Sequence, residues 1–193
     1  EIGKNMQAAV PLVGDVKVIL RQILDLGITA PDCGEWRAML ADFRRAELGR
    51  QFPSRPGSVF PGTAIRKLGA KLDDDAVVCA DVGQHQIFTC KYLPQKHGRL
   101  LTSGGLGTMG YALPAGVGVK AALPDRQTVV VCGDGSFQMA MNELAAVKHS
   151  GMDLKIVLFR NNTLGLVHQI QSRAPYRGPF GVDLDGSPDF ETI

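Results

Sequence analysis

The stretch Thr128-Val-Val-Val-Cys132, followed directly by Gly133-Asp134-Gly135-Ser136, decides the fold of this chain. A run of apolar, mostly β-branched residues is typical of a strand that is buried on both faces. The two glycines allow a sharp turn, and the apolar spacing that follows predicts a helix over 137–149. A buried strand that turns directly into a helix is the repeating unit of α/β folds, so the stretch predicts a parallel sheet.

The same alternation continues on both sides of this stretch. Further strands are expected at Ala76–Ala80 and Leu154–Phe159, because both runs are apolar and bounded by turn residues. Successive strands separated by helices predict a parallel sheet with helices on both faces, incomplete at its C-terminal end. The predicted helices are Thr63–Leu72, Thr108–Leu123 (with a kink expected at Pro114) and Leu164–Gln171.

The N-terminal part of the chain has a different pattern, which predicts three regions. Residues 1–26 contain a short strand at Val10–Val13 and an amphipathic helix over 16–26, and we expect them to be the end of a preceding domain. Residues 27–57 are predicted to be a linker with a short helix, because Pro and Gly punctuate the stretch 52–57. The α/β domain is then expected to span 58–193.

Composition excludes several classes of function. The chain has 193 residues, 45% of them hydrophobic, and a net charge of +2 with scattered basic residues, which argues against a nucleic-acid partner. No apolar run is long enough for a membrane span, so no membrane partner is expected. The four cysteines form no CxxC pair, which favours reduced thiols and a cytoplasmic location.

Polar residues follow each predicted strand at the edge where parallel sheets bind ligands. After Cys132, the helix N-terminus at Gly133–Ser136 offers free N–H groups to a phosphate, yet Asp134 adds a negative charge there. A helix dipole contributes only about 0.3–1 kcal/mol, which cannot offset repulsion between a carboxylate and a phosphate. A divalent cation such as Mg²⁺ would resolve this conflict. The alternative is that Asp134 only caps the helix.

Asn161 follows Asp134 by 27 positions, which is one helix and one strand further along the chain. Adjacent parallel strands would place the two side chains at the same edge of the sheet. An amide oxygen is a neutral hard ligand, so the pair predicts a magnesium–diphosphate site. The alternative is an asparagine-rich turn.

Gly133-Asp134-Gly135 followed at this distance by Asn161 resembles the signature of thiamine-diphosphate enzymes. The resemblance implies that Asp134, Asn161 and the backbone carbonyl of Thr163 bind Mg²⁺, with the register favouring Asn161 over Asn162. It also implies that further residues around these ligands contact the cofactor, namely Gly133, Gly135, Ser136, Leu164, Gly165 and Leu166.

A narrower resemblance rests on other segments. The large catalytic subunit of acetolactate synthase is similar to this chain in Asp81–Gln86, Ser103–Gly110, Leu113–Ala115, Gly165–Val167 and Gln169, and its middle domain ends in a segment that resembles residues 1–26. This resemblance implies that the stretch Val82, Gly83, Gln84 and His85 contacts the diphosphate. It also implies that Met109 holds the cofactor in a V shape, with backbone contacts to the aminopyrimidine from Gly107 and Met109.

Acetolactate synthases decarboxylate pyruvate and condense the two-carbon unit with a second 2-keto acid, in branched-chain amino acid biosynthesis or acetoin formation. The resemblance therefore implies a homodimer or homotetramer, FAD in the parent enzyme and a small regulatory subunit. It places the activating glutamate on a separate N-terminal domain, so no catalytic residue is expected here and the chain alone is expected to be inactive. No glutamate of this chain matches that residue: Glu1, Glu35, Glu47, Glu143 and Glu191.

Two alternatives to acetolactate synthase remain open from the sequence. Gln169-Ile170-Gln171 stands where biosynthetic acetolactate synthases carry Gln-Trp-Gln, a tryptophan associated with preference for 2-ketobutyrate. The chain could therefore resemble another carboligase or decarboxylase, such as glyoxylate carboligase, sulfoacetaldehyde acetyltransferase or 2-hydroxyacyl-CoA lyase. The second alternative is a non-catalytic binding module. A nicotinamide site at Gly105–Gly110 is disfavoured, because no acidic residue follows at the required place.

Overall fold

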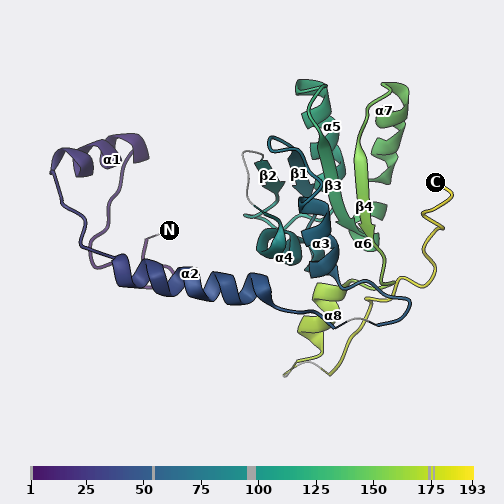
Figure 1. Cartoon of the computed structure of the whole chain (residues 1–193), viewed down its shortest axis with the longest axis horizontal. Helices are drawn as coiled ribbons and strands as arrows, with labels where there is room; N and C mark the ends of the chain where they lie inside the picture. The colour runs from purple at the N-terminus through teal and green to yellow at the C-terminus, as the bar shows by residue number, and fades with distance from the viewer. Residues whose placement is uncertain (1, 54, 95–98, 174, 176) are drawn as a thin grey trace. The chain divides into compact units, whose positions relative to one another are not determined.

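The computed structural model describes residues 2–53, 55–94, 99–173, 175 and 177–193 (Figure 1). The chain divides into two compact units, Glu1–Arg50 and Gln51–Ile193, and each is described by itself. The boundaries expected after residues 26 and 57 stay predictions.

The first unit contains two helices, α1 over Val16–Asp25 and α2 over Gly34–Gly49. The Asp15 side chain accepts a hydrogen bond from the Val18 N–H at 3.1 Å, which satisfies one free donor at the start of α1. None of the described residues 2–50 is buried. The short strand expected at Val10–Val13 was wrong: these residues form no strand, and the described residues of this unit contain no other strand to supply backbone partners.

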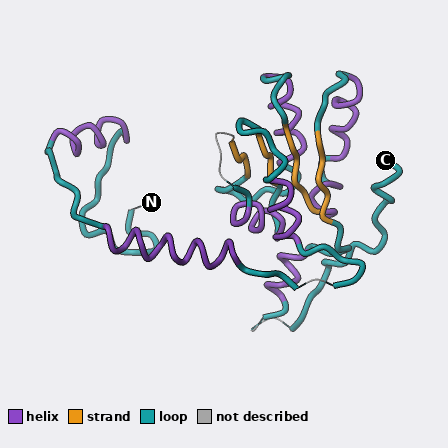
Figure 2. Tube along the Cα trace, in the orientation of Figure 1, coloured by secondary structure: helices purple, strands orange, loops and turns teal. Residues whose placement is uncertain are grey.

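A four-stranded parallel sheet forms the centre of the second unit (Figure 2). Its strands lie in the order β2-β1-β3-β4. The register pairs Val77 with both Arg99 and Thr128, and Gly133 with Phe159. The strands are β1 Val77–Ala80, β2 Arg99–Thr102, β3 Thr128–Gly133 and β4 Lys155–Phe159.

Helices cover both faces of this sheet. On one face, alternate residues of β1 and β3 pack against Leu113 of α5 and Phe137 of α6. On the other face, the remaining residues of these strands pack against Ile65 of α3 and Tyr92 of α4. The predicted α/β class with a parallel sheet is therefore confirmed. The helices of this unit are α3 Pro61–Gly69, α4 Gln84–Tyr92, α5 Ala112–Ala122, α6 Asp134–Gln138, the 3₁₀ turn η1 Met141–Glu143, α7 Leu144–His149 and α8 Gly165–Gln171.

Two helices differ from their predicted form. The helix expected to begin at Thr108 begins at Ala112, so Pro114 lies in its first turn, where the missing N–H removes no helical hydrogen bond. The kink expected there was therefore wrong. The single helix expected over 137–149 is divided, because Ala140 leaves the helical region at φ −135° and its side chain joins the core.

Candidate functional site

A cleft of about 820 Å³ opens at the carboxyl ends of β1, β3 and β4, where ligand sites of α/β proteins lie. This volume is typical of a site for a small organic molecule. The segment before α3 and α3 itself contribute Gly57, Ser58, Val59, Pro61 and Ala64 to its wall. Every residue predicted for cofactor or metal binding lines this one cleft, namely Val82, Gly83, Gln84, His85, Gly107, Met109, Gly133, Asp134, Gly135, Ser136, Asn161, Thr163, Leu164, Gly165 and Leu166.

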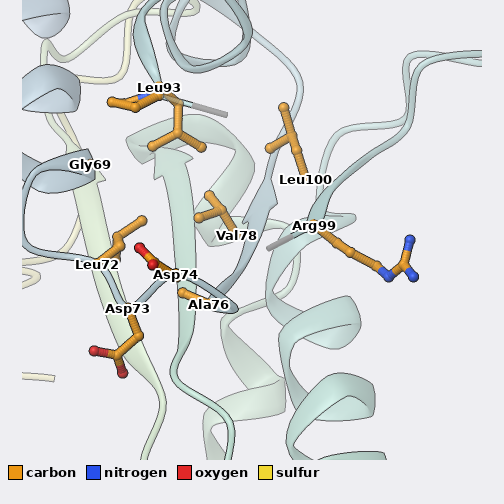
Figure 3. A pocket seen from close by; sticks show the side chains of 10 residues that line it. Gly69, Leu72, Asp73, Asp74, Ala76, Val78, Leu93, Arg99 and Leu100 are labelled. Atoms are coloured by element: carbon orange, nitrogen blue, oxygen red, sulfur yellow. The ribbon is translucent and has the colours of Figure 1, made fainter. Parts of the chain in front are cut away.

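A second hollow lies at the opposite end of the sheet, beside the first residues of β1 and β2 (Figure 3). Its volume is about 20 Å³, which is room for a single water molecule. The Arg99 side chain extends away from the other residues that line it (Figure 3). This hollow is too small for an organic ligand.

The Asp134 carboxylate joins the ends of β3 and β4. It is only 2% exposed, and its Oδ1 accepts a hydrogen bond from the Gly135 N–H at 2.9 Å. Its Oδ2 accepts from the N–H groups of Asn161 at 3.0 Å and Asn162 at 2.6 Å. Gly133, not Asp134, is the N-cap residue of α6. The carboxylate therefore fixes the loop after β4 in addition to accepting one N–H in the first turn of its own helix.

The side chains of the two asparagines in the loop after β4 have different hydrogen-bond partners. The Asn162 side chain accepts a hydrogen bond from Nε of Arg160 at 3.0 Å, on a backbone with φ +55°. The Asn161 side chain lines the cleft, and its Oδ1 accepts from the Thr163 N–H at 3.3 Å. This arrangement favours Asn161 over Asn162 as the residue that faces a ligand.

Thr163 lies opposite Asp183 in an isolated antiparallel bridge. The hydrogen bonds of this bridge are made by the neighbouring residues, from Leu164 N to Val182 O and from Leu184 N to Asn162 O, both at 2.9 Å. Among the described residues, no backbone N–H donates to the Thr163 carbonyl oxygen. The oxygen is therefore available to a ligand in the cleft.

Two glycines of the cleft are closely approached by side chains. A methyl group at Gly165 would lie 2.5 Å from Oε1 of Gln84 and 3.0 Å from Nδ2 of Asn161. A methyl group at Gly135 would lie 2.3 Å from a methyl carbon of Leu164. Both positions exclude any larger residue unless its neighbours move. The glycines therefore let three separate segments converge on one point of the cleft.

His85 lies against two further glycines and is only 8% exposed. Methyl groups at Gly83 and Gly133 would lie 2.7 and 3.0 Å from its Cε1. Burial lowers the pKa of His85 below its ordinary value, while the charges of Asp81 and Asp134 act in the opposite direction. Its buried Nε2 has no hydrogen-bond partner among the described residues. A buried polar atom in this state needs a partner, and a polar ligand in the cleft would supply one.

Side-chain hydrogen bonds connect the walls of the cleft. Nε2 of Gln84, at the start of α4, donates to Oε1 of Gln169 on α8 at 3.0 Å. Asp81, which was not among the predicted site residues, accepts hydrogen bonds from Val82, Gly110 and Ala112. Its place directly after an apolar strand is the signal that could have identified it, because a carboxylate buried there requires donors.

The part of the chain that the structure describes contains no group of three or more His, Cys, Asp or Glu residues that could hold a metal. A magnesium site made of one carboxylate, one amide oxygen and one carbonyl oxygen does not require such a group. Magnesium commonly takes one or two carboxylates and completes its octahedron with phosphate oxygens and water.

Residues 81–193 match the family model for the C-terminal TPP binding domain of thiamine pyrophosphate enzymes. The chain belongs to this family. The matched region begins at Asp81, directly after β1, and contains the segments of the cleft that follow β1, β3 and β4.

Large subunits of acetolactate synthase are among the relatives of this chain. The chain is 39% identical to the isozyme 1 large subunit of Escherichia coli over 194 aligned residues, which is 100% of this chain and 34% of that protein. It is 36% identical to the large subunit of Lactococcus lactis, over 100% of this chain and 34% of that protein. It is 40% identical to a large subunit of Mycobacterium tuberculosis, over 89% of this chain and 29% of that protein.

The chain thus spans about a third of the length of the curated relatives it matches. The resemblance to the thiamine-diphosphate-binding part of these subunits, predicted from residues 81–86, 103–110 and 133–165, is confirmed. None of the helices described in the structure is both long and apolar enough to cross a membrane.

Proposed function

We propose that this chain is the thiamine-diphosphate- and magnesium-binding part of an acetolactate synthase catalytic subunit. The observation that carries the proposal is the Asp134 carboxylate, which holds the Asn161 loop at the mouth of a glycine-lined cleft. The similarity to acetolactate synthase large subunits supports the choice of reaction.

The cleft fits a magnesium-bound diphosphate. We assign Asp134, the Asn161 side chain and the free Thr163 carbonyl as metal ligands, with diphosphate oxygens and water completing the shell. Backbone N–H groups in the first turn of α6, apart from that of Gly135, would donate to the diphosphate, and the unpartnered Nε2 of His85 would hydrogen-bond to the bound group or its water. The glycines leave room for close approach of the backbone to it.

The remaining predicted residues are assigned to the rest of the cofactor. Gly107 and Met109 lie on the loop before α5 and line the same cleft, where they would contact the aminopyrimidine ring. Leu164 and Leu166 form an apolar wall from the loop after β4 and the start of α8. When bound, the cofactor would supply a nucleophilic carbon and a cationic ring that takes up the electron pair released by decarboxylation, while these residues would orient it and exclude water.

The whole protein would act on pyruvate and a second 2-keto acid. We propose that it is a cytoplasmic homodimer or homotetramer with FAD, and that a small regulatory subunit binds it. The activating glutamate would come from another domain, so this chain would supply binding residues only. The four free cysteines support a reducing compartment.

Titration of the full-length protein with thiamine diphosphate, with and without Mg²⁺, tests the metal assignment. We expect Asp134→Asn and Asn161→Ala each to weaken magnesium-dependent binding by at least roughly 10–100-fold, the loss typical of removing even an outer partner of a metal. Asp185→Asn, on the exposed segment after Val182, is the matched control and should bind normally. Equal binding by all of these proteins would contradict the assignment.

A second candidate function is another carboligase of the same family, and Ile170 favours it. This exposed residue of α8 occupies the position where biosynthetic acetolactate synthases carry tryptophan. Product analysis with pyruvate alone, and with pyruvate plus 2-ketobutyrate or glyoxylate, distinguishes the two. Acetolactate from pyruvate alone, or a product of pyruvate with 2-ketobutyrate, supports the first proposal, and absence of both with a product from another substrate supports the second.

A further inference from the structure

Asp81 is a buried carboxylate that the proposed chemistry does not use. It follows β1 directly, its side chain is 1% exposed, and its own N–H donates to Val131 O at 2.8 Å. Oδ1 accepts hydrogen bonds from the N–H groups of Val82 at 2.8 Å and Gly110 at 3.0 Å. Oδ2 accepts from the N–H of Ala112 at 2.8 Å. A carboxylate removed from water is therefore satisfied by three backbone donors.

The donors come from two different segments of the chain. Ala112 is the first residue of α5, whose N-cap residue Tyr111 makes no side-chain capping bond. Asp81, which lies outside this 11-residue helix, thus accepts a hydrogen bond from a free N–H at its start. This is also the end of a helix that favours negative charge. Val82 begins the turn that continues to His85. The same carboxylate therefore holds the turn after β1 and the start of α5 together.

The loop before α5 is anchored at both ends. At its start, the N–H groups of Gly107 and Thr108 donate to the carbonyl and the hydroxyl oxygen of Ser103, at 3.1 and 3.0 Å. At its end, Gly110 donates to Asp81 on a backbone with φ +82°, a conformation that favours glycine. Gly107 and Met109 lie between these anchors and line the cleft.

We propose that Asp81 is a positioning residue, which sets the separation between the Val82–His85 turn and the Gly107–Met109 wall of the cleft. The inference rests on the proposed function, in which the turn contacts the diphosphate and the wall contacts the aminopyrimidine ring. Asp81 touches neither group itself. The rest of the diphosphate end is held by Asp134, so the loss of Asp81 would displace mainly the wall that contacts the ring.

The two ends of the cleft can be probed separately by binding measurements. Magnesium pyrophosphate probes only the diphosphate end of the cleft, whereas magnesium thiamine diphosphate probes both ends. In Asp81→Asn an amide N–H₂ replaces one acceptor oxygen and faces a backbone donor. We expect about tenfold weaker binding of thiamine diphosphate, the size expected when one buried donor loses its acceptor, and unchanged binding of pyrophosphate.

Two further variants separate positioning from general stability. Lys120→Met removes hydrogen bonds from the buried Nζ to the carbonyl oxygens of Pro124 and Arg126 at the other end of α5. It should destabilise the protein without changing the ratio of the two affinities. Ser103→Ala removes the hydroxyl acceptor of Thr108 and keeps the carbonyl acceptor of Gly107, so it weakens the other anchor at a partly exposed site and should weaken thiamine diphosphate binding alone.

Isothermal titration of the full-length proteins at saturating Mg²⁺ measures both affinities. The proposal is overturned if Asp81→Asn and Ser103→Ala bind both probes as the unmodified protein does, or lose both equally. Should Asp81→Asn fail to fold, Ser103→Ala alone decides between these outcomes. Absence of magnesium-dependent thiamine diphosphate binding in the unmodified protein would instead overturn the proposed function, and this inference with it.

Discussion

Gly165 leaves no room for a side chain at the point where α4, the loop after β4 and α8 meet. A methyl group there would displace the Gln84 and Asn161 side chains, whose nearest atoms would lie at 2.5 and 3.0 Å. Both side chains are flexible, so the fold should tolerate Gly165→Ala. Because Asn161 is the proposed metal ligand, we expect magnesium-dependent binding of thiamine diphosphate to weaken by roughly 10–100-fold.

Gly118→Ala is the matched control, since a methyl group at Gly118 meets no atom within 4 Å. This glycine lies inside α5, where alanine is favoured by about 0.5–1 kcal/mol. Thermal unfolding should show that variant to be slightly more stable, and titration should show normal binding. If the two variants bind the cofactor equally well, the crowding at Gly165 has no part in metal binding.

His85 should make stability depend on pH. Because burial lowers its pKa below the ordinary value of 6.5, the unfolded chain binds a proton more readily than the folded chain does in this range. The free energy of unfolding is therefore expected to fall as pH drops below about 6.5, until the lowered pKa of the folded state is passed. Urea unfolding of the metal-free protein at a series of pH values between 5 and 8 measures this dependence.

His85→Asn should have a shallower dependence on pH, whatever its absolute stability. His168→Asn, at an exposed position on α8, is the matched control. If the free energy of unfolding depends on pH equally in the His85→Asn and unmodified proteins, His85 is not the cause of that dependence.

The sequence predicted which residues would gather at the cleft, since each directly follows a strand or belongs to a quoted motif. It could not predict the role of Asp81, whose partners Gly110 and Ala112 lie 29 and 31 positions away. Nor could it separate Asn161 from Asn162 by side-chain direction, which depends on the bond from Arg160. Such contacts are set by tertiary structure and leave no local pattern.

At the scale of elements, the segment after α8 returns to hold the loop that carries the proposed metal ligands. Val182 is buried, and its carbonyl accepts hydrogen bonds from the Leu164 N–H at 2.9 Å and from the Thr163 hydroxyl at 3.0 Å. Further along, Ser187 accepts from the Gln138 side chain at 2.9 Å. The Asn162–Leu164 loop is thus fixed by this segment as well as by Asp134.

Thr163→Val tests this support, because it removes the hydroxyl and keeps the branched shape. Loss of one hydrogen bond costs about 0.5–1.5 kcal/mol, so amide hydrogen exchange at Leu164 and Leu184 should accelerate by roughly 2- to 12-fold. Exchange in β1, for example at Val78, serves as the internal control and should change less. Unchanged exchange at Leu164 and Leu184 would mean that the hydroxyl does not stabilise the loop.

The strands β1, β3 and β4 were predicted because continuous apolar runs between turn residues define them, whereas the strand expected at Val10–Val13 was wrong. Helix α4 was not predicted, since its buried residues are the polar or aromatic His85, Thr89 and Tyr92, which form no apolar stripe. The return of the segment at Val182–Leu184 could not be predicted either. An isolated bridge between distant segments has no periodicity to detect.

At the scale of the whole molecule, Gln51–Ile193 has its own core, and the segment before α3 contributes to it. The ring of Phe52 stacks on Phe60 with centroids 4.5 Å apart and meets Tyr92 edge-on at 5.1 Å. The Arg66 guanidinium lies 4.5 Å from the centre of the Phe52 ring, within the range of cation–π attraction. Residues that the sequence predicted to be linker are therefore packed against the α/β unit.

The unit Gln51–Ile193 is expected to fold without the residues that precede it. Both apolar clusters that pack on the sheet consist of residues of this unit alone, so removal of residues 1–50 should leave the melting temperature within about 3 °C. Phe52→Ala in the shortened chain should lower it by about 5 °C or more, because the ring loses contact with Phe60, Tyr92 and Arg66. Thermal unfolding followed by circular dichroism compares the three proteins. A shortened chain that melts far below the full one would show that residues 1–50 stabilise the α/β unit, and a harmless Phe52→Ala would show that the aromatic cluster does not.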